Sequence, residues 1–235
     1  MTVIKSIAMR VLAIDTALEA CAAAVLDTEQ GRMTSESLPM VRGHAEALMP
    51  LIERVMKQAD MQFAALDRIG VTTGPGSFTG LRVGIAAARG IALAATKPAF
   101  GLTTLAAYAA PYIAADDKAA VAVAIDARHQ HVYLQVFGAG GRTLVTPRIA
   151  SAADAARLSA AGAGVRIVGT GARLVADAWP AREPPPALVE DLRAPDIVWV
   201  GRLAVAATDA GDGPKPLYLR APDAQPQDAA RLPRR

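Results

Sequence analysis

The stretch GPGSFTGLRVG, residues 74–84, decides the fold of this chain together with the segments on either side of it. It follows the apolar run LDRIGVTT, residues 66–73, which predicts a buried strand. Glycine and proline are frequent in its first half, so the loop can adopt backbone conformations that other residues avoid. Thr79 is the predicted N-cap of a helix that runs to about Ala95. A strand, a glycine loop and a helix N-terminus in this order can present backbone N–H groups to an anion.

The loop matches neither of the two common phosphate-binding sequences. A P-loop has lysine followed by serine or threonine after its last glycine, whereas Leu81 and Arg82 follow Gly80 here. The dinucleotide fingerprint G-x-G-x-x-G has two residues between its second and third glycines, and this loop has three. The loop is therefore equally consistent with an anion site and with a tight turn that binds nothing.

Two predicted helices carry more apolar surface than one core needs. In residues 80–95, small residues recur every four positions in two rows, and either row would let a second helix approach closely. In residues 43–59, apolar side chains span an arc of about 160°, with Met49 and Met56 at one edge, as on adaptable binding surfaces. The alternative is that the protein's own domain covers both helices. The two rows are Gly80, Gly84 and Ala88, and Ala86, Gly90 and Ala94.

Composition indicates a well-packed globular protein. The chain has 235 residues, of which 52% are hydrophobic and 20% charged, enough for one large or two small domains. Its apolar stretches are short or interrupted, so no membrane-spanning segment is predicted. Lys5 and Arg10 interrupt the region where a signal peptide would need an apolar core. The single cysteine, Cys21, excludes an internal disulfide. We therefore expect a cytoplasmic protein that makes no contact with a membrane.

Charge and histidine patterns give little support for a nucleic-acid or metal site. The net charge is +3, the aromatic content is 4%, and basic residues do not alternate with aromatic ones along the chain. His129 and His131 alternate along a predicted hairpin strand, without an evident third metal ligand nearby. His44 begins a predicted helix, where we expect an exposed structural role.

An internal repeat organises the whole chain. VLAID, residues 11–15, and VAVAID, residues 121–126, are both apolar strands that end in aspartate. In each half, two further strands, a helix, another strand and another helix follow, so both halves predict the order βββαβα. The later predicted elements are residues 20–26, 33–38, 43–59, 66–73 and 80–95 in the first half, and 132–137, 143–149, 151–161 and 165–169 in the second. This order is that of a ribonuclease H-like domain, and its duplication is the α/β architecture of actin-like and sugar-kinase ATPases.

The repeat predicts two ribonuclease H-like domains, residues 1–104 and 105–235, with a crossing at residues 98–104, a proline-rich surface loop at 180–186 and a late helix at 196–210. Asp15 and Asp126 would both face the cleft between them. Nucleotide-binding members usually carry glycine just after such an aspartate, whereas Thr16 and Ala127 follow here. The two aspartates could hold Mg²⁺ through water, or could simply cap the strand ends. A vestigial nucleotide or anion loop would use Asp15, Thr16, Gly74, Gly76, Ser77, Thr79 and Asp126.

Five segments together resemble the TsaB (YeaZ) family of the bacterial system that makes threonylcarbamoyladenosine in tRNA. They are VLAIDTALEACAAAVL, HAEALMPLI, LDRIGVTTGPGSFTGLRVGIAAARGIALA, DARHQHVY and PLYLR. The resemblance implies the duplicated fold inferred above and a non-catalytic scaffold subunit, an inactive paralogue of the catalytic subunit TsaD. It implies a heterodimer with TsaD, formed by helices of the two N-terminal halves, and a larger complex with the ATPase TsaE. This complex modifies the adenosine beside the anticodon.

By position, the partner helices implied by this resemblance are residues 44–59 and 80–95. The subunit would require no cofactor or metal, because ATP and Mg²⁺ are used by the wider complex, and its contact with tRNA would be indirect. A homodimer through the same helices is an alternative resting state. A stand-alone ATP-dependent enzyme that uses the cleft is the rival function. The predicted interface residues are His44, Glu46, Leu48, Met49, Ile52, Val55, Met56, Gly80, Arg82, Val83, Gly84, Ala87, Ala88 and Ile91.

Two features depart from the family pattern. His131 stands where a glutamate is usual, which leaves any role of that acidic position in doubt. The H-x-x-x-H metal motif of TsaD is absent, so the peptidase activity once associated with the family is not expected here.

Overall fold

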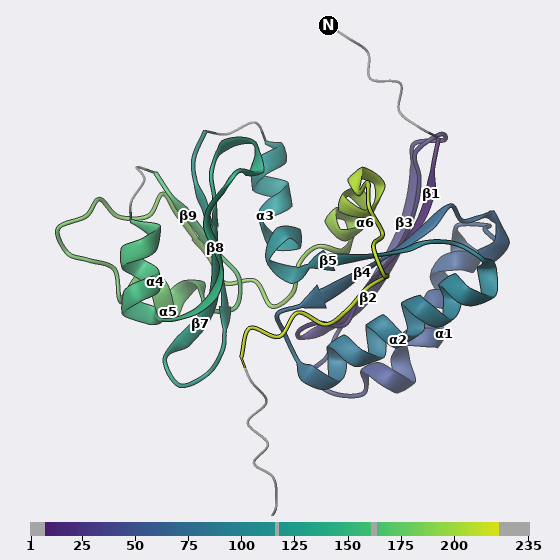
Figure 1. The fold of residues 1–235 in the computed structure, drawn as a ribbon, viewed down its shortest axis with the longest axis horizontal. Coiled ribbons are helices and arrows are strands. Elements are labelled where there is room, and N and C mark those ends of the chain that lie inside the picture. Colours follow the sequence, from purple (N-terminus) through teal and green to yellow (C-terminus); the bar gives the residue numbers. More distant parts are fainter. Residues whose placement is uncertain (1–7, 116–117, 161–163, 221–235) are drawn as a thin grey trace, which may run out of the picture.

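Two five-stranded sheets form the framework of the chain (Figure 1). The structure is a computed structural model that describes residues 8–115, 118–160 and 164–220. The predicted βββαβα order is confirmed in both halves, and the duplicated α/β fold with it.

The first sheet has the strand order β3-β2-β1-β4-β5. Its antiparallel strands are β1, β2 and β3, and β1 also pairs parallel with β4, which pairs parallel with β5. β2 and β4 are buried almost throughout because helices cover both faces. The edge strand β3 instead alternates between exposed and half-buried residues. The elements are β1 (Arg10–Asp15), β2 (Ala20–Asp27), β3 (Arg32–Pro39), α1 (His44–Gln58), η1 (Phe63–Ala65), β4 (Arg68–Gly74), α2 (Phe78–Ala95) and β5 (Ala99–Thr103).

The second sheet repeats this plan with the order β10-β9-β6-β7-β8. β6 pairs antiparallel with β7 and parallel with β9, as β1 does with β2 and β4. Its elements are α3 (Thr104–Ala114), β6 (Val121–Asp126), β7 (His131–Phe137), η2 (Ala139–Gly141), β8 (Thr143–Ser151), α4 (Ala152–Ser159), β9 (Arg166–Val168), α5 (Ala172–Asp177), β10 (Leu188–Glu190) and α6 (Ile197–Ala206).

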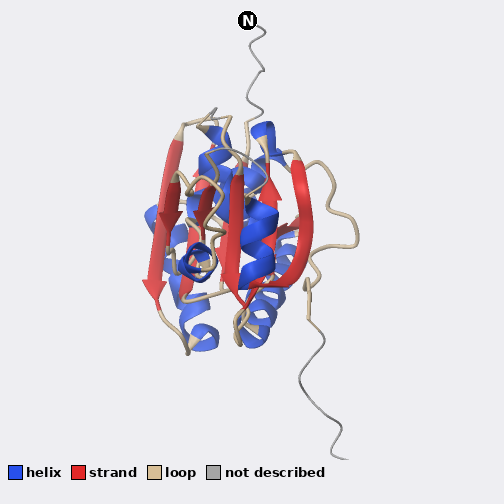
Figure 2. Cartoon of the chain, turned by 90° about the vertical axis from the view of Figure 1, so that its left-hand side faces the viewer, coloured by secondary structure: helices blue, strands red, loops and turns tan. Residues whose placement is uncertain are grey.

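The sheets and helices stack in layers. α1 and α2 cover the outer face of the first sheet, α4 and α5 cover the outer face of the second, and α3 and α6 lie between the sheets (Figure 1). The perpendicular view shows the strands running side by side with the helices packed on them (Figure 2). α6 packs on β1, β2 and β4, although it follows the second sheet in sequence. Gly70 of β4 permits this approach, because a Cβ at that position would overlap the Cβ of Ala204.

Three predicted boundaries are wrong. Residues 98–104 are not a crossing, because 99–103 form β5, which satisfies backbone groups of β4 that would otherwise lack partners. The N-cap of α2 is Ser77 rather than Thr79, and the Ser77 hydroxyl accepts a hydrogen bond from the Gly80 N–H at 3.3 Å. The helix predicted at 196–210 ends at Ala206, and Asp196 caps its start by accepting from the Val198 N–H at 2.9 Å.

One helix in the described residues, α2, is long and apolar enough by length and composition to cross a membrane, which the sequence patterns did not predict. A core helix of a globular domain passes the same test. Here α2 packs on β4, and Leu81, Ile85 and Ile91 are among its buried side chains. The apolar side chains on the face of α2 that meets β4 are therefore part of the protein's own core.

Candidate functional site

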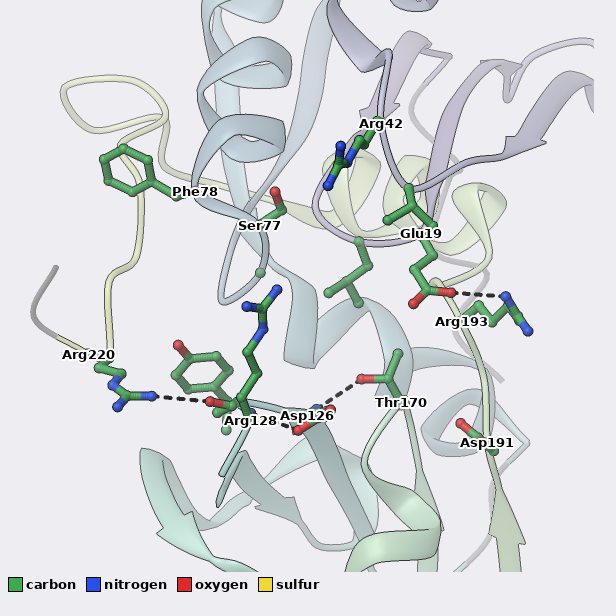
Figure 3. A pocket seen from close by; sticks show the side chains of 15 residues that line it. Glu19, Arg42, Ser77, Phe78, Asp126, Arg128, Thr170, Asp191, Arg193 and Arg220 are labelled. Atoms are coloured by element: carbon green, nitrogen blue, oxygen red, sulfur yellow. Dashed lines mark hydrogen bonds and ion pairs between the residues drawn. The ribbon is translucent and has the colours of Figure 1, made fainter. Parts of the chain in front are cut away.

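A cleft of about 810 Å³ lies between the two halves (Figure 3). The first half contributes Leu18 and Glu19 after β1, Arg42 before α1, and the start of α2. The second half contributes the turn after β6 and residues near β7, β9 and β10. The full lining is Leu18, Glu19, Val41, Arg42, Gly76, Ser77, Phe78, Asp126, Ala127, Arg128, Tyr133, Thr170, Asp191, Arg193 and Arg220.

Asp15 does not face this cleft, so the prediction that both strand-terminal aspartates do so is wrong for this residue. Its side chain is completely buried, and Oδ1 accepts hydrogen bonds from the Thr72 hydroxyl and from the Ala17 N–H at 3.1 Å. Oδ2 has no hydrogen-bond partner among the described residues. Burial raises the pKa of Asp15 above its usual value, and these hydrogen bonds oppose the rise only in part. A carboxyl group sealed in this way is poorly placed to hold Mg²⁺ from the cleft.

Asp126 does line the cleft, but it also acts as a cap. Its Oδ1 accepts a hydrogen bond from the Arg128 N–H at 2.7 Å, and its own N–H donates to the Thr170 hydroxyl at 2.9 Å. Thus, of the two strand-terminal aspartates, Asp126 is the one that is accessible from the cleft, and its carboxylate stabilises the turn that follows β6.

The histidines differ from expectation. His129 lies in this turn with a positive φ of 53°, and β7 begins only at His131, so the two do not alternate along one strand. No group of three histidine, cysteine, aspartate or glutamate side chains in the described residues could hold a metal ion. His44 is buried rather than exposed, with Nε2 at 3.1 Å from the carbonyl oxygen of Leu18.

The glycine loop is docked on the segment that follows β1. The Ser77 N–H donates to the carbonyl oxygen of Ala17 at 2.7 Å, and the Thr16 hydroxyl donates to the carbonyl oxygen of Gly80 at 2.7 Å. A Cβ at Gly76 or Gly80 would overlap the backbone of this segment. Of the predicted anion loop, Gly76, Ser77 and Asp126 line the cleft, whereas Asp15, Thr16 and Gly74 are buried and do not line it. Thr79 is exposed.

Most of the predicted partner-interface residues lie in the core of the first half. The row Gly80, Gly84, Ala88 faces inward, because a Cβ at Gly84 would overlap the Thr16 hydroxyl oxygen. The prediction that this row accepts a second protein is therefore wrong for the chain as it folds here. Glu46, Met49 and Arg82 are exposed, and Val83 and Ala87 are half-buried. The buried members are His44, Leu48, Ile52, Val55, Met56, Gly80, Gly84, Ala88 and Ile91.

The second row of small residues borders an open apolar groove of about 560 Å³ between α1, η1 and α2. Gly90 lies in this groove, and no atom of the described residues comes within 4 Å of a Cβ added there. Met49, 49% exposed, forms another part of the wall. Sequence reasoning named this row but left Gly90 and Ala94 out of the interface, and it missed Phe63 of η1, which carried no recognisable signal. The groove is lined by Met49, Phe63, Ala64, Ala87, Gly90, Ile91, Ala94 and Ala95.

Comparison with known proteins places this arrangement in a family. The family model described as TsaD, tRNA N6-adenosine threonylcarbamoyltransferase, matches residues 39–177. The structure of YeaZ from Pseudomonas aeruginosa is 30% identical and superposes with a TM-score of 0.74 over 90% of this chain and all of that one. The chain belongs to the TsaB (YeaZ) family.

Curated relatives match this chain over different shares of their length. The "tRNA threonylcarbamoyladenosine biosynthesis protein TsaB" of Escherichia coli is 36% identical over 125 residues, and that of Haemophilus influenzae is 34% identical. The chain spans about half the length of these two relatives, 53% and 52%. An uncharacterized protein of Mycobacterium tuberculosis is 33% identical over 92% of this chain and 94% of its own.

Proposed function

We propose that this chain is a non-catalytic subunit of threonylcarbamoyladenosine biosynthesis that binds and supports TsaD through the groove between α1 and α2. The names of the TsaB relatives supply the pathway, and the match to the TsaD family model is consistent with a paired, related subunit. The single observation that carries the proposal is the open groove beside Gly90, which is almost entirely apolar and which no described side chain fills. Apolar grooves of this shape are one of the recurring ways in which proteins receive the apolar face of a partner helix.

The groove suits a partner helix in particular. Small residues every four positions let two helix axes approach to about 8 Å, the close end of the usual packing range. Met49 can adapt its side chain to the partner surface. The first half, residues 1–104, would thus supply the interface, as the resemblance to the family implies. A second copy of this chain is the alternative occupant when TsaD is absent.

A non-catalytic role agrees with the geometry of the cleft. Asp15 is sealed from it, and the loop before α2 uses the Ser77 N–H within the fold rather than toward a phosphate. These contacts disfavour a stand-alone ATP-dependent enzyme. In this proposal the subunit needs no cofactor or metal of its own, ATP and Mg²⁺ serve the wider complex with TsaE, and the assembly works in the cytoplasm.

The proposal is tested with Gly90→Leu, whose side chain would enter the groove from a position where no described atom lies within 4 Å of an added Cβ. The chain, alone and mixed with TsaD of the same organism, is analysed by size-exclusion chromatography with light scattering. We expect a one-to-one complex for the natural chain and at least tenfold weaker association for Gly90→Leu, a loss of about 1.4 kcal/mol. Ala153→Leu, a small-to-large change at an exposed position of α4, is the matched control and should leave the complex intact. Equal association by the natural chain and Gly90→Leu would contradict the proposal.

A further inference from the structure

The cleft holds two arginine side chains that no described residue neutralises. Of its four arginines, Arg193 pairs with Glu19 at 3.1 Å, and Arg220 donates to the carbonyl oxygen of Ala127 at 3.2 Å. Neither Arg42 nor Arg128 has a side-chain hydrogen bond or ion pair within the described residues. Both point into the cleft, Arg42 from the first half and Arg128 from the second (Figure 3).

The acidic side chains of the cleft already have partners. Glu19 is bound to Arg193, and Asp191 lies 3.7 Å from Arg173. Asp126 accepts the Arg128 N–H, which uses the carboxylate to fix the backbone. A backbone hydrogen bond does not remove the charge of Asp126. Four arginines line the cleft against three carboxylates, so the described lining carries a small excess of positive charge, which suits an anionic ligand.

A constrained turn positions Arg128. Three successive residues, Arg128, His129 and Gln130, have positive φ values of 64°, 53° and 61°, a conformation that non-glycine residues rarely adopt. Backbone hydrogen bonds hold the turn at both ends, from Ala127 N–H to the His131 oxygen at 2.9 Å and from Ala152 N–H to the Gln130 oxygen at 2.9 Å. Unfavourable backbone of this kind persists where the surroundings fix it, and it occurs often at functional sites.

An exposed aromatic shelf adjoins the cleft. Phe78 lines the cleft and is 45% exposed, and the ring of Tyr218, 43% exposed, lies 5.4 Å from it between centroids. The Arg82 guanidinium lies 3.7 Å from the centroid of Phe78, and its Nε donates to the Tyr218 hydroxyl at 3.3 Å. These residues come from α2 and from the segment after α6, so the sequence did not show that they would gather.

We propose that the cleft and its aromatic shelf bind a single-stranded segment of RNA. Arg42 and Arg128 would contact phosphates, and the Phe78–Tyr218 shelf would stack a base, which is how grooves for single strands combine charge and aromatic rings. An acidic peptide would use the arginines, but its acidic side chains would leave the exposed ring without a stacking partner. The choice of RNA rests on the proposed function, in which the complex acts on tRNA, and it makes the contact of this subunit with RNA direct, where the resemblance to the family implies an indirect one.

The first test measures RNA binding to the full chain by fluorescence anisotropy. The probe is a fluorescein-labelled single-stranded RNA of about ten nucleotides, a length within the range that one such groove covers. The variant Arg42→Glu/Arg128→Glu should bind at least tenfold more weakly. The slope of log affinity against log salt should fall by about 1.4, since each phosphate contact to a single strand contributes about 0.7. Arg32→Glu/Arg142→Glu is the control with the same change in net charge. These residues are exposed and lie at the strand ends opposite to the cleft.

A second variant tests the shelf. Phe78→Leu keeps an apolar side chain but removes the stacking face, and we expect roughly tenfold weaker binding of RNA, from stacking energies of 1–3 kcal/mol per base. Trp199→Leu is the matched control, because Trp199 also carries an arginine, Arg202, 4.4 Å over its ring but lies on α6 outside the cleft. Binding that Phe78→Leu leaves unchanged would overturn the role of the shelf.

Three results would overturn the inference as a whole. They are no detectable RNA binding, equal losses in the cleft pair and the control pair, and displacement of the RNA by ATP or inorganic phosphate as effective as by unlabelled RNA. Association of each variant with TsaD is measured in parallel. A cleft variant that still forms the complex with TsaD but no longer binds RNA supports the inference. If the natural chain binds RNA but not TsaD, only the proposed scaffold function is rejected.

Discussion

Gly84 and Gly90 lie on the same helix, yet their surroundings predict opposite effects of one substitution. A Cβ at Gly84 would overlap the Thr16 hydroxyl, whose hydrogen bond to the Gly80 carbonyl holds the loop to the segment after β1. Gly84→Ala should therefore lower the free energy of unfolding by about 1–3 kcal/mol. Gly90→Ala should raise it by about 0.8–1 kcal/mol, because the site is open and alanine favours the helix. Chemical denaturation of both variants measures this difference, and shifts of the same sign would contradict it.

Asp15 should make stability depend on pH. Because burial raises its pKa, the folded protein retains a proton that the unfolded chain releases above the usual carboxyl value of 3.8. The stability that this carboxyl group contributes is then fully present below 3.8 and is lost as the pH rises through the folded pKa. Asp15→Asn cannot titrate, so its unfolding free energy relative to the natural chain should rise with pH from about 4 upward. Denaturant titrations over a pH series measure this difference, and a constant difference would rule out the raised pKa.

The two aspartates also show where sequence reasoning ends at the residue scale. Asp15 and Asp126 both close an apolar strand, and the sequence placed both in one cleft. Only the docking of α2 on the segment that follows β1 seals Asp15 away, and that docking depends on contacts between residues 64 positions apart, such as Thr16 with Gly80. The charge of Arg42 and Arg128 was likewise visible in the sequence, but their convergence was not.

At the scale of elements, the order of strands and helices was predictable because it rests on local periodicity. The boundaries of these elements were less predictable. Ser77 and Thr79 are both residues that cap helices, and the sequence gives no reason to prefer either. The hydrogen bond from the Ser77 N–H to the Ala17 oxygen fixes the entry of the chain and selects Ser77. β5 was mistaken for a crossing for a similar reason, since its partner β4 precedes it by the whole of α2.

The cap of α2 gives a direct test at this scale. Ser77→Ala removes the hydroxyl that accepts the Gly80 N–H, and it should cost about 1 kcal/mol of stability. Thr79→Ala, two residues further along and exposed, should change stability by less than about 0.5 kcal/mol, as surface substitutions do. Thermal or chemical denaturation compares the two. A larger loss of stability for Thr79→Ala than for Ser77→Ala would indicate that Thr79 is the N-cap, as the sequence predicted.

At the scale of the whole molecule, α6 joins what the repeat presents as two separate halves. Its residues Ile197 and Val200 pack in a cluster with Ala13 and Leu26 of the first sheet, while α3 lies against β6 and contacts α6. The division at residue 104 stays a prediction, because the first sheet depends on a helix from the far end of the described chain. Removing α6 would expose the apolar residues of that face.

We therefore expect the two sheets to unfold as one cooperative unit. The chain has two tryptophans. Trp179 packs on the core of the second sheet, and Trp199 is half-buried on α6, the helix that packs on the first. Trp199→Phe leaves a fluorophore that reports on the second half, and Trp179→Phe leaves one that reports on the contact of α6 with the first. Guanidinium titrations of each variant, followed by fluorescence and by far-ultraviolet circular dichroism, should give coincident midpoints for both probes. Because α6 spans the two halves, loss of either sheet should remove packing from the other. A Trp179 transition separated from the Trp199 transition would instead show that the halves are independent domains and that α6 detaches without disturbing the second sheet.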